Sequence, residues 1–243
     1  MSADYPTLPF DNQIVRNIRV AVQKTRSYEE FWAFYVLRRF SIYLSVLFAK
    51  MPVLSSPNSV TVLGIIGMLL ATKFALTGNS RGFLLACFFY HFSYLLDCVD
   101  GEVARLTNRC SKIGKFLDIF LDSTNVLLLF GFAYGSLNFT LQTSSGLSWL
   151  IFISFVGLIS FIIPRLLVTK SVSAFGLPIS LTTQLRHSNL WLDVVAFLFS
   201  PPGLYTLIPI TILFSLSIEL VLKIYAIGLL AKTLFRIGLA LIK

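Results

Sequence analysis

The stretch Asp97-Cys-Val-Asp100-Gly101-Glu-Val-Ala104-Arg105, followed by Asp118-Ile-Phe-Leu-Asp122, decides how the rest of this sequence is interpreted. It places four carboxylates in long apolar segments, where an ionisable group is costly and needs a partner or a function. Within each pair the acids are three or four residues apart, so on a helix they share a face. Because a short turn joins the two segments, we expect antiparallel neighbouring helices whose four acids converge in one pocket.

The composition argues against a water-soluble protein. Hydrophobic residues make up 56% of the 243 residues and charged residues 13%, with a mean hydropathy of +0.81. So little charge cannot cover a water-facing surface, and the bilayer is the better solvent. The net charge of +9 can serve nucleic-acid binding. The apolar excess instead favours an anionic lipid leaflet or an anionic substrate, and we expect no nucleic-acid partner.

Apolar segments of about 20 residues, the length that crosses a bilayer, recur along the chain. Four are clear, at residues 60–76, 83–106, 113–134 and 147–167. We expect two more between residues 190 and 239, where Pro201, Pro202 and Pro209 blur the boundaries and the break falls at 201–203 or near 215–217. The sequence therefore predicts an all-α membrane protein with six transmembrane helices.

An aromatic-rich stretch precedes these segments, at residues 28–50, and Arg38 and Arg39 interrupt it. This pattern fits an amphipathic helix lying at the membrane interface better than a distorted spanning helix. We therefore expect an N-terminal arm with an interfacial helix over residues 1–50 and a six-helix membrane domain over residues 51–243.

Basic residues mark one side of the membrane. They gather in the N-terminal arm, in the turn after the second expected span, after the fourth span and in the C-terminal tail, whereas residues 138–148 carry no charge. Lys and Arg favour the cytoplasmic side. We therefore expect both termini and the turn between the acidic pairs to face the cytoplasm, which an even number of spans allows.

Four ionised carboxylates close together repel one another, and bound cations relieve that repulsion. Ligand sets made of oxygen alone favour Mg²⁺, Mn²⁺ or Ca²⁺ over zinc. Two such ions can bridge a pyrophosphate and stabilise a leaving oxygen. Gly101 and Ala104, which have no bulky side chain, leave room for a ligand beside the acids. Gly114 does the same on the facing helix, or allows the helices to pack closely.

The full pattern D-x2-D-G-x2-A-R-x8-G-x3-D-x3-D, from Asp97 to Asp122, resembles the signature of the CDP-alcohol phosphotransferases. Ser56-Pro57-Asn58-Ser-Val-Thr61 is similar to the P-N-x-x-T element that opens the first membrane helix of that family. The resemblance covers essentially the whole membrane part. It implies six helices, a homodimer, and an enzyme that moves a substituted phosphate from a CDP-alcohol to an acceptor hydroxyl and releases CMP.

The resemblance also implies roles for individual residues. Asp97, Asp100 and Asp118 would hold two divalent ions, Mg²⁺ or Mn²⁺. Asp122 would help to coordinate these ions and act as the general base. Arg105 would contact the donor phosphate or brace the aspartates. The remaining residues would line the nucleotide pocket: Pro57, Asn58, Thr61, Gly101, Ala104 and Gly114.

Several alternatives stay open. The donor is CDP-diacylglycerol, our first candidate, or a CDP-linked headgroup such as CDP-inositol, CDP-choline or CDP-ethanolamine. Arg165, Lys170 and Arg186 either bind an acceptor phosphate or reflect only the bias of basic residues to the cytoplasmic side.

Three further expectations concern single features. Glu102 is expected to be solvated or to pair with Lys112 or Arg109. Gly131 and Gly135 form a G-x-x-x-G pattern for helix packing, within the chain or at a dimer seam. A divalent-metal transporter is the alternative from another functional class, because intramembrane acids also occur there.

Overall fold

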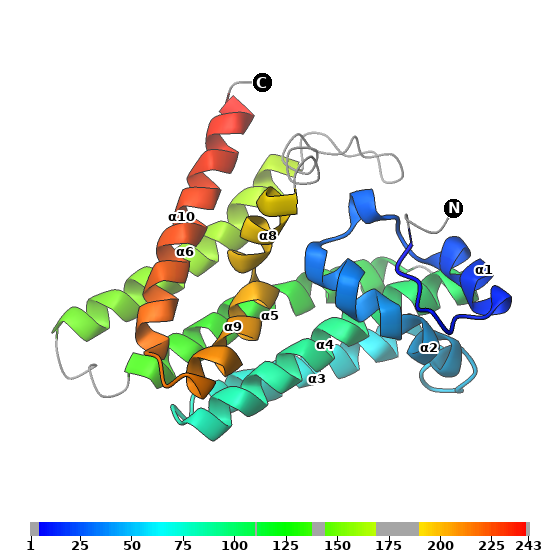
Figure 1. The fold of residues 1–243 in the computed structure, drawn as a ribbon, viewed down its shortest axis with the longest axis horizontal. Helices are drawn as coiled ribbons and strands as arrows, with labels where there is room; N and C mark the ends of the chain where they lie inside the picture. The colour runs from blue at the N-terminus through cyan, green and yellow to red at the C-terminus, as the bar shows by residue number, and fades with distance from the viewer. Residues whose placement is uncertain (1–4, 110, 138–143, 169–189, 242–243) are drawn as a thin grey trace. The chain divides into compact units, whose positions relative to one another are not determined.

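The computed structural model describes residues 5–109, 111–137, 144–168 and 190–241 of the chain (Figure 1). All regular elements in these ranges are helices, and none of the described residues forms a strand. The predicted all-α class is therefore confirmed.

The N-terminal arm contains short elements. Helix α1 spans Gln13–Val22, a 3₁₀ turn spans Arg26–Tyr28, and a π-helical turn at Ala33–Leu37 leads into α2 at Arg38–Ala49. Asn12 caps α1, since its side chain accepts a hydrogen bond from the Val15 N–H at 2.9 Å. The helix expected over residues 28–50 is thus shorter and is entered through a π-helical turn. Its position at a membrane interface stays a prediction.

Helix α2 turns a polar face inward. Arg38, Ser41 and Ser45 are buried, whereas Phe40 and Leu47 are about half exposed, at 54% and 48%. The buried polar residues are spaced by three and four positions, so they form one stripe along the helix. Such a stripe needs polar partners on the element that covers it.

Four long helices match the clear apolar segments. These are α3 at Pro57–Ala75, α4 at Ser80–Thr107, α5 at Lys112–Leu137 and α6 at Ser144–Val168. Each is long and apolar enough to cross a membrane, for α6 over Gly146–Ile163. The four predicted spans are therefore confirmed as helices of the required length and composition.

The C-terminal third departs from the expected pair of spans. Helices α8 (Leu190–Leu198) and α9 (Pro201–Leu213) meet at a bend of 72° and together pass as one broken span, whereas α10 (Ile218–Leu241) is not among the candidate spans. The described residues thus support four spans, or five with the bent pair, and the expected count of six is not confirmed. Pro201 and Pro202 open α9, because proline fits the first turn of a helix but cannot continue one.

The chain divides into two compact units. The first comprises residues 1–68 and 90–122, and the second comprises residues 69–89 and 123–243. The first unit contains the N-terminal arm and all four signature aspartates. Its core is a cluster of buried residues, Val60 on α3 with Leu96, Val99 and Val103 on α4, packed against Leu44 and Phe48 of α2. The boundary that we expect near residue 50 stays a prediction.

The G-x-x-x-G pattern lies in the second unit and packs within the chain. A Cβ added to Gly135 would lie 2.3 Å from the Ala75 carbonyl oxygen, and one added to Gly131 would lie 3.2 Å from the Thr72 carbonyl oxygen. The small residues therefore let the backbones of α3 and α5 approach closely. The expected packing role is met inside one chain, and a dimer contact stays a prediction.

We expect Gly135→Ala to destabilise the protein by about 1–3 kcal/mol, because a methyl group there overlaps the backbone of α3. Gly238→Ala is the matched control, since a Cβ at this helical glycine of α10 meets no atom within 4 Å. Thermal unfolding of both purified variants in detergent measures the difference. Equal melting temperatures would contradict the close α3–α5 contact.

Candidate functional site

The turn between α4 and α5 brings the two acidic helices side by side. Asn108 adopts a left-handed conformation with φ 54°, which a short polar residue tolerates better than most. The Arg109 N–H then bonds to the Ala104 carbonyl oxygen at 3.0 Å, which closes α4 as a Schellman motif does. Ser111 starts α5, because its hydroxyl oxygen accepts a hydrogen bond from the Gly114 N–H at 2.9 Å.

The four aspartates act on one another across this pair of helices. The charges of Asp118 and Asp122 act on Asp97, and those of Asp97 and Asp118 act on Asp100. Asp100 is buried, Asp97 is half-buried, and Asp118 and Asp122 are exposed. The acids therefore form a cluster in which the α4 side chains are shielded from the surface and the α5 side chains are exposed.

The side chains of the acidic cluster are farther apart than the ligands of a bound metal ion. Among the described residues, no three side chains of Asp, Glu, His or Cys are placed closely enough to hold a metal ion. The donor set itself still fits a hard cation, because it consists of carboxylate oxygens. The hydroxyl of Thr61 supports Asp100 from behind, as outer partners of metal ligands commonly do.

The P-N-x-x-T element at the start of α3 lies against the acidic helices. Thr61 is buried, and its hydroxyl donates to Asp100 Oδ2 at 2.7 Å and bonds to the Pro57 carbonyl oxygen at 3.2 Å. Asn58 Oδ1 accepts from the Ser111 hydroxyl at 3.3 Å, and a Cβ on Gly114 would approach the same oxygen to 3.0 Å. Residues more than 35 positions apart thus meet at one place, and Gly114 is small because Asn58 lies beside it.

Arg105 fills the space beside Gly101. A Cβ added to Gly101 would lie 3.5 Å and 3.6 Å from the two terminal nitrogens of the Arg105 guanidinium. The Arg105 Nε donates a hydrogen bond to the Val22 carbonyl oxygen of the N-terminal arm. The Arg105 guanidinium thus lies in ordinary contact range of Gly101, beside the part of α4 that carries Asp97 and Asp100.

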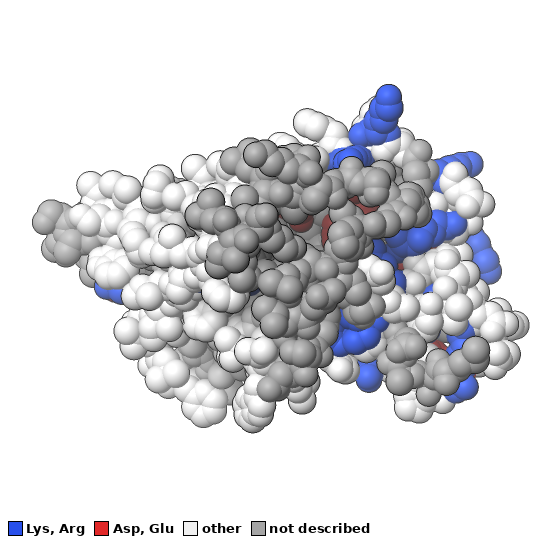
Figure 2. Space-filling model, turned by 90° about the horizontal axis from the view of Figure 1, so that it is seen from above, with Lys and Arg blue, Asp and Glu red and all other residues white. Residues whose placement is uncertain are grey.

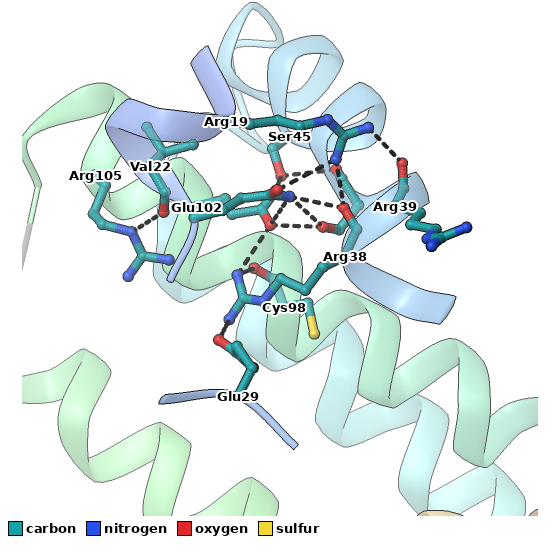
Figure 3. A network of polar contacts seen from close by, with 11 residues as sticks. Arg19, Val22, Glu29, Arg38, Arg39, Ser45, Cys98, Glu102 and Arg105 are labelled. Carbon is teal, nitrogen blue, oxygen red and sulfur yellow. Dashed lines mark hydrogen bonds and ion pairs between the residues drawn. The ribbon is translucent and has the colours of Figure 1, made fainter. Parts of the chain in front are cut away.

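Glu102 is the site residue whose surroundings the sequence did not reveal. It is fully buried, and its carboxylate accepts hydrogen bonds from Gln23 Nε2 at 2.9 Å, Arg38 Nη1 at 2.9 Å and Ser41 Oγ at 2.6 Å (Figure 3). Ser45 Oγ donates to its other oxygen at 2.7 Å. The expectation that Glu102 is solvated or pairs with Lys112 or Arg109 is wrong, because the residue faces the polar stripe of α2. The spacing of Arg38, Ser41 and Ser45 was the signal for this contact.

The N-terminal arm also adds positive charge near the acids. The charges of Lys24 and Arg38 act on Asp97. Burial disfavours a charged Arg38, but interactions with Cys98, Glu29 and Glu102 outweigh burial and raise the pKa of the guanidinium above its ordinary value. Arg38 therefore keeps its positive charge.

Exposed basic side chains surround this end of the first unit. Figure 2 shows blue side chains gathered on the end of the chain that carries the N-terminal arm. The exposed basic residues of this unit lie in two places, on the arm and near the α4–α5 turn. They are Arg16, Lys24 and Lys50 on the arm, and Arg105, Arg109, Lys112 and Lys115 near the turn. Such a surface carries the charge that attracts anions.

The residues expected to bind an acceptor phosphate are not brought to the site by the described structure. Arg165 belongs to α6, but its side chain is outside the described residues, as are Lys170 and Arg186 altogether. Their role stays a prediction.

Long apolar helices with an acidic cluster near the turn between two of them define a multi-pass membrane protein with a polar site at one end of its helices. The sequence profile described as CDP-alcohol phosphatidyltransferase matches residues 54–231. The chain belongs to that family.

Two relatives are similar over part of this chain. Cholinephosphotransferase 1 of Bos taurus is 29% identical over 128 residues, which cover 49% of this chain and 30% of the relative. Archaetidylinositol phosphate synthase of Pyrococcus horikoshii is 36% identical over 83 residues, which cover 34% of this chain and 43% of the relative. The chain thus spans less than half the length of these relatives.

We expect Thr61→Val to destabilise the protein by about 1–3 kcal/mol, because the buried Asp100 loses the hydrogen bond from the Thr61 hydroxyl. Thr77→Val is the matched control, since Thr77 is exposed and bonds only to the Phe74 carbonyl oxygen of its own turn. Thermal unfolding in detergent at neutral pH compares the two. A melting temperature of Thr61→Val equal to that of Thr77→Val would argue against the Thr61–Asp100 bond.

Proposed function

We propose that the chain is an integral membrane transferase of phospholipid biosynthesis. It moves a substituted phosphate from a CDP-alcohol to the hydroxyl of an acceptor alcohol and releases CMP. The observation that carries this proposal is the meeting of the acidic cluster of α4 and α5 with Thr61 and Asn58 of α3. The family match over residues 54–231 supports the same reaction class.

We propose that the cofactor is a pair of divalent ions, Mg²⁺ or Mn²⁺. Asp97, Asp100, Asp118 and Asp122 would hold the ions, and the hydrogen bond from Thr61 would orient Asp100. When bound, such ions neutralise the pyrophosphate charge and make the phosphorus more electrophilic.

The side chains then have distinct tasks. Asp122, at the exposed side of the cluster, accepts the proton of the acceptor hydroxyl, for which it must come within about 3 Å of that oxygen. The acceptor oxygen forms a bond to the β-phosphorus, and the bond from that phosphorus to the bridging oxygen breaks. CMP leaves with the bridging oxygen. Arg105 and Lys24 provide positive charge for the phosphates.

The nucleotide would lie where α3 meets the turn between α4 and α5. Pro57, Asn58 and Thr61 come from one side, and Gly101, Ala104 and Gly114 provide surface without bulk from the other. The site and both termini would face the cytoplasm, following the basic residues. Arg165, Lys170 and Arg186 would bind a phosphate on the acceptor, and the active form would be a homodimer.

Two donor types remain candidates. The name of the archaeal relative, a synthase of archaetidylinositol phosphate, favours a lipid-linked donor of the CDP-diacylglycerol type with a polyol phosphate acceptor. The name of the bovine relative, a cholinephosphotransferase, favours a CDP-linked headgroup. A lipid donor is our first proposal; the archaeal relative is 36% identical over 83 residues and the bovine relative 29% over 128 residues, so identity alone does not rank the two donor types. The transporter alternative has no support from the family match.

Incubation of the purified protein with Mg²⁺ or Mn²⁺, CDP-diacylglycerol, CDP-choline, CDP-ethanolamine or CDP-inositol, and a panel of acceptors tests the proposal. We expect release of CMP with one donor class, dependent on both the acceptor and the divalent ion. Absence of CMP release with all donors and acceptors would refute the proposed reaction.

Asp122→Asn should lower the rate of CMP release by about 10²–10⁴-fold, the range of general base catalysis, because the amide cannot take a proton. Glu219→Gln, which alters an ion pair with Lys223 on α10, is the control and should keep the wild-type rate. Thermal unfolding verifies that both variants fold. A wild-type rate for folded Asp122→Asn would refute the assignment of the base.

A further inference from the structure

The N-terminal arm is attached to the signature helix by a network of buried charges and hydrogen bonds (Figure 3). Glu102 lies at its centre and accepts four hydrogen bonds, from Gln23, Arg38, Ser41 and Ser45. Arg38 also forms an ion pair with Glu29 at 2.8 Å and reaches the Cys98 carbonyl oxygen at 3.5 Å. Breaking a buried pair of this kind typically costs several kcal/mol, because a charge is left without its partner.

The buried Arg19 side chain holds α1 against α2 and forms a further buried ion pair, with Asp11. Arg19 is fully buried, and its guanidinium bonds to Asp11 at 2.7 Å and to the carbonyl oxygens of Arg38 and Arg39 at 2.8 Å each. Burial disfavours a charged Asp11, but hydrogen bonds from Arg19, Tyr43 and the Leu8 N–H outweigh burial and lower the pKa of Asp11 below its usual value. The arm therefore has a fixed position relative to Arg38, and through Arg38 relative to Glu102.

Two consecutive residues of the arm form hydrogen bonds with two residues of the signature motif on α4. Gln23 donates to Glu102, and the Val22 carbonyl oxygen accepts from Arg105. Glu102 and Arg105 are three positions apart, so they share one face of α4. The next residue of the arm, Lys24, is exposed and its charge acts on Asp97. The bond to Glu102, together with the bond from Gln23 to the Arg38 carbonyl oxygen, therefore holds residues 22 and 23 against the same face of α4 as Arg105.

We infer that Glu102 is a positioning residue that sets the affinity for the nucleoside diphosphate donor by way of the arm. With Gln23 bound to Glu102, the neighbouring Val22 carbonyl oxygen accepts a hydrogen bond from Arg105, and the charge of Lys24 acts on Asp97. Without the Gln23–Glu102 bond, the Val22 carbonyl oxygen shifts and its hydrogen bond from Arg105 weakens. This inference rests on the proposed function, because it requires the donor to bind at the signature motif.

Direct binding of CMP and CDP to the purified full-length protein, by calorimetry in detergent, tests the inference apart from catalysis. We expect Glu102→Gln and Gln23→Ala to weaken binding by about 10–100-fold, the range found when a residue that supports a binding group from the outer shell is removed. Glu30→Gln is the matched control, because Glu30 is an exposed acid of the same unit that accepts a single hydrogen bond from Tyr94. It should bind as the wild type does.

A double-mutant cycle with Arg105→Ala separates positioning from general loss of stability. If Glu102 acts through Arg105, Glu102→Gln adds little further loss of nucleotide affinity once Arg105 is removed. Full additivity of the two losses, or wild-type affinity of folded Glu102→Gln and Gln23→Ala, would overturn the inference. Gln23→Ala keeps the test valid if Glu102→Gln does not fold, because it removes the bond to Glu102 and leaves the buried Glu102–Arg38 ion pair intact.

The outcome also distinguishes the two proposals. A wild-type protein that neither binds CMP nor releases it from any CDP-alcohol would refute the proposed function. A wild-type protein that binds CMP and is unaffected by the Glu102 and Gln23 substitutions would refute only the positioning role.

Discussion

The structure depends on one constraint, the cost of placing charge among apolar helices. In its first unit this cost is met in two ways. Glu102 and Arg38 are buried and bonded to each other, with Gln23, Ser41 and Ser45 completing the contacts. The four aspartates instead remain a cluster of like charge, which bound cations can stabilise. The first group serves to fix the structure, and the second is available for chemistry.

The local geometry explains why these charges gather at one place. Asn108 ends α4 in a left-handed conformation and Ser111 starts α5, so the chain reverses within a few residues. Thr61 and Asn58 then join the start of α3 to this turn, through Asp100 and Ser111. Gly114 has a physical reason to be small, because a Cβ there would approach the Asn58 side-chain oxygen to 3.0 Å. The residues of the signature pattern are thus the ones at which α3, α4, α5 and the N-terminal arm contact one another.

Much of this was predictable from periodicity and spacing, and the rest was not. Apolar length predicted α3 to α6, and the same-face spacing of Asp97, Asp100, Asp118 and Asp122 predicted one acidic cluster. The partners of Glu102 lie 57 to 79 positions away, and nothing local to Glu102 identifies them. The expected count of six spans is not confirmed, since α8 and α9 meet at a bend of 72° and α10 is not among the candidate spans of the described residues.

The most direct test of this account is whether acids on both helices serve one cation site. Mn²⁺ titration of the purified protein, followed by electron paramagnetic resonance, compares the wild type with Asp100→Asn on α4 and Asp118→Asn on α5. The account predicts saturable Mn²⁺ binding by the wild type and a loss of about tenfold or more in affinity for each variant. Wild-type affinity in the Asp118→Asn protein, or no Mn²⁺ binding by the wild type, would contradict a site shared between α4 and α5.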